Sequence, residues 1–132
     1  PGEMDRLLKS SMIDTEGDRI ELARKAAAKW RQVVLLKGAY TVVANPDGHA
    51  TIIPFANPGL ASAGTGDVLA GTVVGFLAQG LSPYDAAIAG AYIHGLAGEL
   101  VREEKGTAGM VASDLLPMLP LAIAEIREPK TP

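Results

Sequence analysis

The middle of the chain reads Asn57-Pro58-Gly59-Leu60-Ala61-Ser62-Ala63-Gly64-Thr65-Gly66-Asp67 and continues directly into Val68-Leu69-Ala70-Gly71. We call residues 57–67 the glycine loop. Its glycines let a ligand approach the backbone closely, because glycine has no Cβ atom and accepts positive φ angles. The apolar segment that follows predicts a helix, whose first turn offers unpaired N–H groups and the positive end of the helix dipole. The glycine loop therefore predicts an anion-binding cradle with one carboxylate, Asp67, beside it.

The glycine loop does not match either of the common phosphate-binding motifs. It lacks the Lys-Ser or Lys-Thr pair of a Walker A loop, and Leu69 stands where the dinucleotide fingerprint requires its third glycine. Each residue alone also has a structural interpretation, since glycine serves turns and aspartate is a frequent helix N-cap. Three glycines in one loop ahead of a helix nevertheless favour close approach of a ligand.

The composition excludes several classes of protein. The chain has 132 residues, the size of one domain, and its 48% apolar and 20% charged residues exclude a disordered protein. A net charge of −3 gives no reason to expect nucleic acid or an anionic membrane. The absence of cysteine excludes disulfides and thiolate metal sites and fits the reducing cytoplasm. The uncharged stretch 68–84 is interrupted by glycine and proline, which leaves it too short to span a bilayer.

Helical and strand patterns alternate in the first part of the chain. Residues 3–9 predict a short helix, and residues 15–18 predict the start of a second helix with an apolar face that carries Ile20, Ala23, Ala27 and Trp30. Short apolar runs predict strands at 33–36, 40–43 and 51–53, the last two joined by the hairpin turn Asn45-Pro46-Asp47-Gly48. A helix that leads into a buried strand is typical of an α/β fold.

The rest of the chain is predicted to be helical. Residues 67–78 are apolar nearly all round, so we expect this helix to lie in the core. Ser82-Pro83 predicts the start of a helix that runs to about Glu103, and its small residues allow close packing on the preceding helix. His94, in this small-residue helix, fits a hydrogen-bonded packing residue better than a catalyst. Ser113 is predicted to cap a last helix with one apolar side formed by Leu115, Leu116, Leu119 and Ile123, and its two prolines, Pro117 and Pro120, are expected to limit its regularity.

The glycine loop and the helix start after it resemble the nucleotide loop of the ribokinase-like superfamily, and more closely that of the ATP/ADP-dependent NAD(P)H-hydrate dehydratases. Three other segments resemble the same family: Pro1-Gly2-Glu3-Met4 with Arg6-Leu7, Lys37-Gly38-Ala39-Tyr40-Thr41, and Ser113-Asp114-Leu115-Leu116. Together they extend over almost the whole chain. The resemblance implies the three-layer α/β fold of that superfamily, with helices packed on a central sheet.

The resemblance also implies a repair reaction. Enzymes of this family phosphorylate the hydroxyl of hydrated NADH or NADPH with ADP or ATP, and loss of phosphate restores the cofactor. By position, Asp67 would be the catalytic base and would contact the hydrated cofactor, while Gly64, Thr65 and Gly66 would hold the transferred phosphoryl group. The adenine nucleotide would contact Asn57 in the glycine loop and the segment that we call the lysine turn, which consists of Lys37, Gly38, Ala39, Tyr40 and Thr41. Phosphoryl transfer needs mostly positioning and charge stabilisation, which amides at a helix N-terminus supply.

Further properties of the protein follow from the resemblance. Mg2+ is expected to offset the nucleotide charge, although no carboxylate cluster in the sequence marks a metal site of the protein itself. A cytoplasmic homo-oligomer is expected, without a nucleic-acid or membrane partner. The sequence leaves open which of the two nucleotides is the donor. It also leaves open whether Lys37 is a ligand of the nucleotide or a solvated residue at a strand end.

The chain departs from the family pattern at its start. We expect residues 1–132 to be the C-terminal part of one domain, because the N-terminal half of the family domain and the histidine before Pro1 are missing. Whether this part is active alone stays open. Two other functions also stay open: a small-molecule kinase of the same superfamily, acting on a vitamin precursor or a sugar, and a non-catalytic nucleotide-binding module.

Overall fold

A computed structural model describes residues 2–10 and 18–128 of the chain. Its helices are α1 (Gly2–Ser10), α2 (Arg19–Trp30), α3 (Thr65–Ala78), α4 (Pro83–Lys105), α5 (Ala112–Leu115) and α6 (Met118–Arg127), with a 3-10 turn η1 (Pro58–Ala61). Its strands are β1 (Val34–Leu36), β2 (Val42–Ala44) and β3 (Ala50–Ile52). The helices predicted at 3–9, 67–78 and 82–103 and the three strands are confirmed. The predicted start of α2 at residues 15–17 lies outside the described residues, and Asp18 caps that helix by accepting the Glu21 N–H at 2.9 Å.

The three strands form an antiparallel sheet in the order β1-β2-β3. The predicted hairpin turn joins the last two strands, and its Gly48 adopts a φ of 95°, which a residue with a side chain rarely adopts. The Asn45 N–H donates to the His49 carbonyl at 2.8 Å and closes the turn. The turn residues therefore set the register that pairs Ala44 with Ala50.

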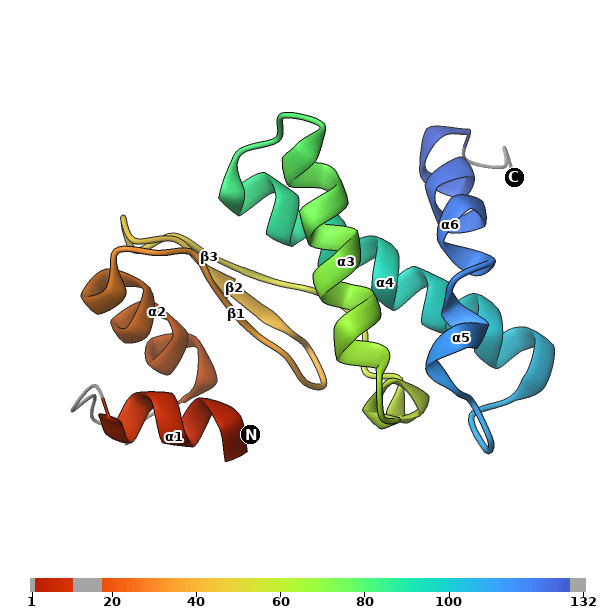
Figure 1. Ribbon diagram of the computed structural model, residues 1–132, viewed down its shortest axis with the longest axis horizontal. Coiled ribbons are helices and arrows are strands. Elements are labelled where there is room, and N and C mark those ends of the chain that lie inside the picture. The colour runs from red at the N-terminus through yellow and green to blue at the C-terminus, as the bar shows by residue number, and fades with distance from the viewer. Residues whose placement is uncertain (1, 11–17, 129–132) are drawn as a thin grey trace.

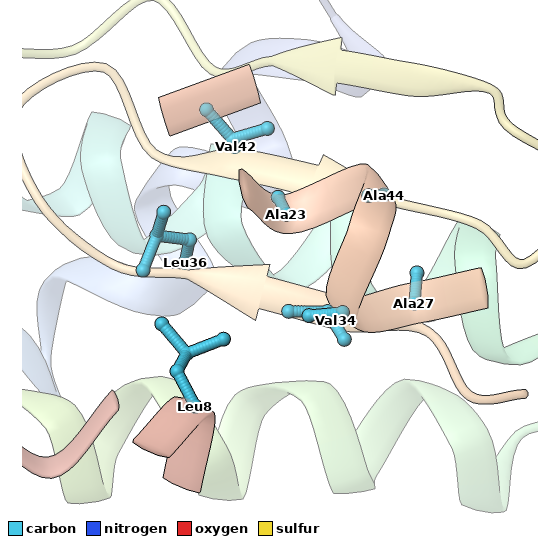
Figure 2. Packing of buried hydrophobic residues seen from close by; sticks show 8 residues of the cluster. Leu8, Ala23, Ala27, Val34, Leu36, Val42 and Ala44 are labelled. Atoms are coloured by element: carbon cyan, nitrogen blue, oxygen red, sulfur yellow. The ribbon is translucent and has the colours of Figure 1, made fainter. Parts of the chain in front are cut away.

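Helices cover both faces of this sheet, so the molecule has the expected three layers (Figure 1). On one face, α1 and α2 pack against β1 and β2 through small and branched side chains. Figure 2 shows this cluster, which contains Leu8, Ala23, Ala27, Val34, Leu36, Val42 and Ala44. On the other face, β2 and the segment after β3 pack against α3 and α4 through Val43, Ile53, Leu69, Ala87 and Ala91. A third cluster joins α4 to α5 and α6.

Two expectations about the helices are wrong. Only Thr65 and Leu69 of α3 are buried, whereas Val74 is 60% exposed. A helix is buried all round only where neighbours cover every side, and α3 packs mainly against α4 and α5. The last helix is interrupted at Pro117, which separates α5 from α6, in agreement with the irregularity expected from its prolines. Its start, however, is not capped by Ser113: the Asp114 carboxylate accepts the Val111 N–H at 3.1 Å instead.

The close packing expected between α3 and α4 is confirmed at Gly90. A Cβ atom added there would lie 2.6 Å from Cγ2 and 3.1 Å from Cα of Val73. We predict that Gly90→Ala lowers the free energy of unfolding by about 1–3 kcal/mol, since the helices must separate to admit the methyl group. Thermal unfolding checks this. The control is the double variant Gly90→Ala/Val73→Ala, in which the smaller side chain at position 73 makes room for the added methyl group. An unchanged or raised melting temperature in Gly90→Ala would show that the contact is loose.

None of the described helices is long and apolar enough to cross a membrane.

Candidate functional site

The glycine loop is fixed to α4 by the side chain of Asn57. Its Oδ1 accepts the Gly59 N–H at 2.9 Å, which starts η1, and its Nδ2 donates to the Gly98 carbonyl of α4 at 2.8 Å. Asn57 is buried, so both contacts are shielded from water. The loop therefore enters the site on a rigid support, and one of the residues predicted to contact the nucleotide also builds the scaffold.

Thr65 lies at the centre of the glycine loop and is completely buried. Its Oγ1 lies 2.6 Å from the Leu60 carbonyl and 2.9 Å from the Ser62 carbonyl, so the hydroxyl proton is donated back into the loop. Gly64, with a φ of 85°, makes the turn before the helix. Because a hydroxyl also accepts hydrogen bonds, Thr65 has an acceptor site left for a further donor.

The backbone N–H groups at the start of α3 are unequally used. The Gly64 carbonyl accepts the N–H groups of Asp67 at 3.1 Å and Val68 at 3.2 Å. The N–H groups of Gly64 and Gly66 have no hydrogen-bond partner within residues 2–10 and 18–128. Unpaired amides at a helix N-terminus attract anions, so this turn retains the donors that a phosphate requires.

The lysine turn connects β1 to β2 and has a constrained backbone. The Thr41 hydroxyl accepts the Gly38 N–H at 3.2 Å and donates to the Gly38 carbonyl at 3.0 Å. Tyr40 has a φ of 53°, in the left-handed region that residues with side chains seldom occupy, and its side chain is exposed. Strained backbone of this kind persists where surrounding contacts hold it, and it is common at ligand sites.

Lys37 brings the lysine turn to the glycine loop. Its Nζ donates to the Thr65 Oγ1 at 3.1 Å, across 28 positions of sequence. A Cβ atom added at Gly66 would lie 3.7 Å from the same Nζ, so the ammonium group also stands beside an unpaired amide. An ammonium group next to free amides at a positive helix end favours the binding of an anion.

A cavity of about 560 Å³ lies beside this contact, within the size range of small-molecule sites. It brings together five of the predicted nucleotide-binding residues, Lys37, Gly38, Ala39, Thr41 and Asn57, with Glu3 of α1 and His94 of α4. Its apolar walls include Ile53, Phe55, Leu60 and Leu69.

Asp67 does not line this cavity. It is exposed and lines a second cavity of about 540 Å³, between α3 and the α5–α6 segment, with Gly71, Thr72, Phe76 and Leu119 among its neighbours. The Asp67 side chain and the lysine turn therefore line different cavities. No group of three or more His, Asp and Glu side chains within the described ranges could hold a metal ion.

Two residues at the site were not predicted from the sequence to act there. Arg19, the first residue of α2, donates from Nη1 to the Ala39 carbonyl at 2.6 Å and from Nη2 to the Leu36 carbonyl at 3.0 Å. His94 reaches the Thr65 carbonyl with Nε2 at 2.9 Å. Arg19 looks like an ordinary charge at a helix start in the sequence, and only the fold brings it to the turn. The burial of His94 among small residues was the one available signal.

Arg19 clamps both sides of the lysine turn, so we predict that Arg19→Ala weakens nucleotide binding. The two charge-assisted hydrogen bonds hold the carbonyls before and after Lys37-Gly38, and the turn loosens without them. We expect a loss of roughly 1–2 kcal/mol in binding of ADP, measured by calorimetric titration. Arg19→Lys should recover little, because an ammonium group lacks the two-pronged geometry.

The control for Arg19 is Arg24→Ala, five residues further along α2. Arg24 pairs with Glu21 at 3.2 Å on the surface, and such pairs contribute little. Equal losses of ADP affinity in the two variants would show that helix α2, and not the clamp, is responsible.

The sequence and the fold of the chain are similar to those of known proteins. The sequence model of the family described as NAD(P)H-hydrate dehydratase matches residues 1–121. The bifunctional NAD(P)H-hydrate repair enzyme Nnr of Moorella thermoacetica is 48% identical over 97% of this chain and 24% of its own length. The ADP-dependent (S)-NAD(P)H-hydrate dehydratase of Neisseria meningitidis is 41% identical over 89% of this chain and 40% of its own. The chain thus spans about a quarter of the first relative and 40% of the second.

A solved structure shows the same fold. The ADP/ATP-dependent NAD(P)H-hydrate dehydratase of Bacillus subtilis, co-crystallised with ATP/Mg2+, superposes with a TM-score of 0.78 at 36% identity. The match covers 82% of this chain and 39% of the Bacillus protein. The predicted α/β fold is therefore confirmed by an independent structure. With the family match over residues 1–121, these similarities show that the chain belongs to the NAD(P)H-hydrate dehydratase family.

Proposed function

We propose that the protein containing this chain restores hydrated NADH and NADPH by phosphorylating the added ring hydroxyl with ADP or ATP and then eliminating phosphate. The observation that carries the proposal is the 3.1 Å contact between Lys37 Nζ and Thr65 Oγ1, which unites the two predicted nucleotide segments. The nucleotide lies along the lysine turn, with its terminal phosphate at the first turn of α3. The free amides of Gly64 and Gly66 and the Lys37 ammonium group face the charge that develops during transfer.

Asp67 acts as the base in this proposal. As the ring hydroxyl oxygen bonds to the terminal phosphorus, the Asp67 carboxylate takes the hydroxyl proton, and the bond from phosphorus to the rest of the nucleotide breaks. The bond between the ring carbon and the phosphate oxygen then breaks, and the neighbouring ring carbon loses a proton. Phosphate is released, and the ring double bond forms again. The exposed position of Asp67, on the side of α3 away from the lysine turn, supports separate approaches for the hydrated cofactor and the nucleotide.

Mg2+ is compatible with these residues as a companion of the nucleotide. Mg2+ is usually held largely by substrate phosphates and waters, so its main ligands here would be the phosphates of the nucleotide beside the first turn of α3. Bound there, the ion would neutralise phosphate charge.

We also propose a homo-oligomer in the cytoplasm. The exposed Val74 and Leu77 of α3 support an interface, and the absence of cysteine fits a reducing compartment.

The test uses the full-length protein with hydrated NADH, Mg2+ and either ADP or ATP. Recovery of the absorbance of the reduced cofactor, together with release of phosphate, is the expected result, and the faster nucleotide identifies the donor. Transfer of phosphate to a sugar or a vitamin precursor without cofactor recovery would favour a small-molecule kinase. Binding of nucleotide without turnover of any alcohol would favour a non-catalytic module.

A further inference from the structure

His94 is a buried titratable residue to which the proposed reaction assigns no role. It lies in the middle of α4 and is 4% exposed. Its Nε2 is 2.9 Å from the carbonyl oxygen of Thr65, 29 positions earlier in the sequence. It also lines the cavity that contains Lys37 and Glu3, the two charged residues on the cavity wall. The hydrogen-bond geometry determines which form of the ring is present.

A carbonyl oxygen only accepts hydrogen bonds, so the proton in this contact belongs to His94 Nε2. Burial lowers the pKa of His94, and the positive charge of Lys37 lowers it too, while the bond to Thr65 opposes both effects. The ring is therefore neutral near pH 7, with its hydrogen on Nε2. A neutral donor at this place binds the Thr65 carbonyl without adding a second positive charge beside Lys37.

The Thr65 carbonyl and the Gly66 N–H belong to one planar peptide group. In a trans peptide the two bonds point in opposite directions, so a contact that fixes the oxygen also fixes the direction of the N–H. The Gly66 N–H has no hydrogen-bond partner among the described residues. A hydrogen bond received by the oxygen also polarises the peptide and strengthens its N–H as a donor.

We propose that His94 is a positioning residue of the phosphoryl site, which acts through the Thr65–Gly66 peptide to aim the Gly66 N–H at the transferred phosphate. The proposal rests on the proposed function, because it assigns the phosphate to this turn. A positioning role of His94 can be distinguished from a role in which the side chain only fills space. A space-filling role predicts equal loss of affinity for all nucleotides, whereas a positioning role affects the terminal phosphate alone.

The test compares His94→Leu with His94→Gln in the full-length protein. Leucine fills the space without a donor, whereas the glutamine Nε2 can donate to the same carbonyl. We expect His94→Leu to lower ATP affinity and kcat about tenfold while AMP affinity and the melting temperature stay near those of the wild type. His94→Gln should restore most of the loss. Equal losses for AMP and ATP, or no advantage of glutamine over leucine, would overturn the proposal.

Nitrogen NMR of the unaltered protein gives a readout that requires neither folding of a variant nor catalysis. We expect the His94 ring to carry its proton on Nε2 at neutral pH, and the Gly66 amide resonance to shift when inorganic phosphate is added. A ring protonated on Nδ1 alone, or a Gly66 amide unaffected by phosphate, would overturn the assignment of His94. Failure of the dehydratase assay with both NMR results as expected would instead overturn the proposed reaction and leave the anion site in place.

Discussion

We expect Asp67→Asn to abolish most of the cofactor recovery and to leave nucleotide binding nearly intact. The amide is isosteric with the carboxylate but does not accept the hydroxyl proton, and a positioned general base contributes about 10²–10⁴ in rate. Because Asp67 is exposed and lies outside the cavity of the lysine turn, its loss removes no contact of the nucleotide segment. The measurement is kcat for recovery of NADH absorbance, beside the dissociation constant for ADP.

The matched control is Asp85→Asn. Both aspartates lie in the first turn of a helix, where a negative charge interacts favourably with the dipole by about 0.3–1 kcal/mol. Asp85 belongs to α4 and contacts Ser82 at 2.7 Å, away from the glycine loop. We expect its kcat to stay at the wild-type value. A rate for Asp67→Asn within threefold of the control, about 0.65 kcal/mol, would remove Asp67 from the chemistry.

Local sequence patterns were sufficient to predict most elements of this fold. Turn residues such as Gly48 have few alternatives to a hairpin, and Ser82-Pro83 leaves little choice for the start of α4. The glycine loop was visible for the same reason, since Gly64 makes the turn before α3 with a φ of 85°, which residues with a side chain rarely adopt. These features depend on residues that are close together in the sequence, so short sequence patterns were enough to predict them.

Features that depend on neighbours distant in sequence were not predictable in this way. The hydropathy of α3 indicates that its side chains prefer burial, but not whether an element covers Val74 and Leu77. Arg19 reaches the lysine turn because α2 packs on β1 and β2, a relation that no spacing in the sequence reveals. His94 could be placed in the core but not against Thr65, because the partner was unknown. Resemblance supplied the roles of Lys37 and Asp67, and the structure then supplied the contact between Lys37 and Thr65.

We expect Lys37→Met to lower kcat by a factor of about 10²–10³, which is the range found when one donor to a developing negative charge is removed. Methionine keeps the unbranched stem of lysine but not the ammonium group. Thr65 loses only a donor to its oxygen, while its own proton still has the Leu60 carbonyl as acceptor, so the fold should remain stable. Lys37→Arg should restore part of the rate, because arginine keeps the positive charge. It should not restore all of it, because the planar guanidinium group differs in shape from an ammonium group.

The Lys37→Met variant is also expected to change the pKa of His94. This pKa reports the charge of residue 37 and not the shape of its side chain. Burial is the main cause of the lowered pKa of His94, and the positive charge of Lys37 lowers this pKa further. Lys37→Met should therefore raise the pKa of His94 part of the way toward its ordinary value, whereas Lys37→Arg should leave it low. An NMR titration of the His94 ring measures the shift, with Lys29→Met on the exposed side of α2 as the control. A loss of rate in Lys37→Met without a higher His94 pKa would show that Lys37 is displaced from Thr65 in solution. A raised pKa with an unchanged rate would show that its charge lies beside Thr65 but does not face the transferred phosphate.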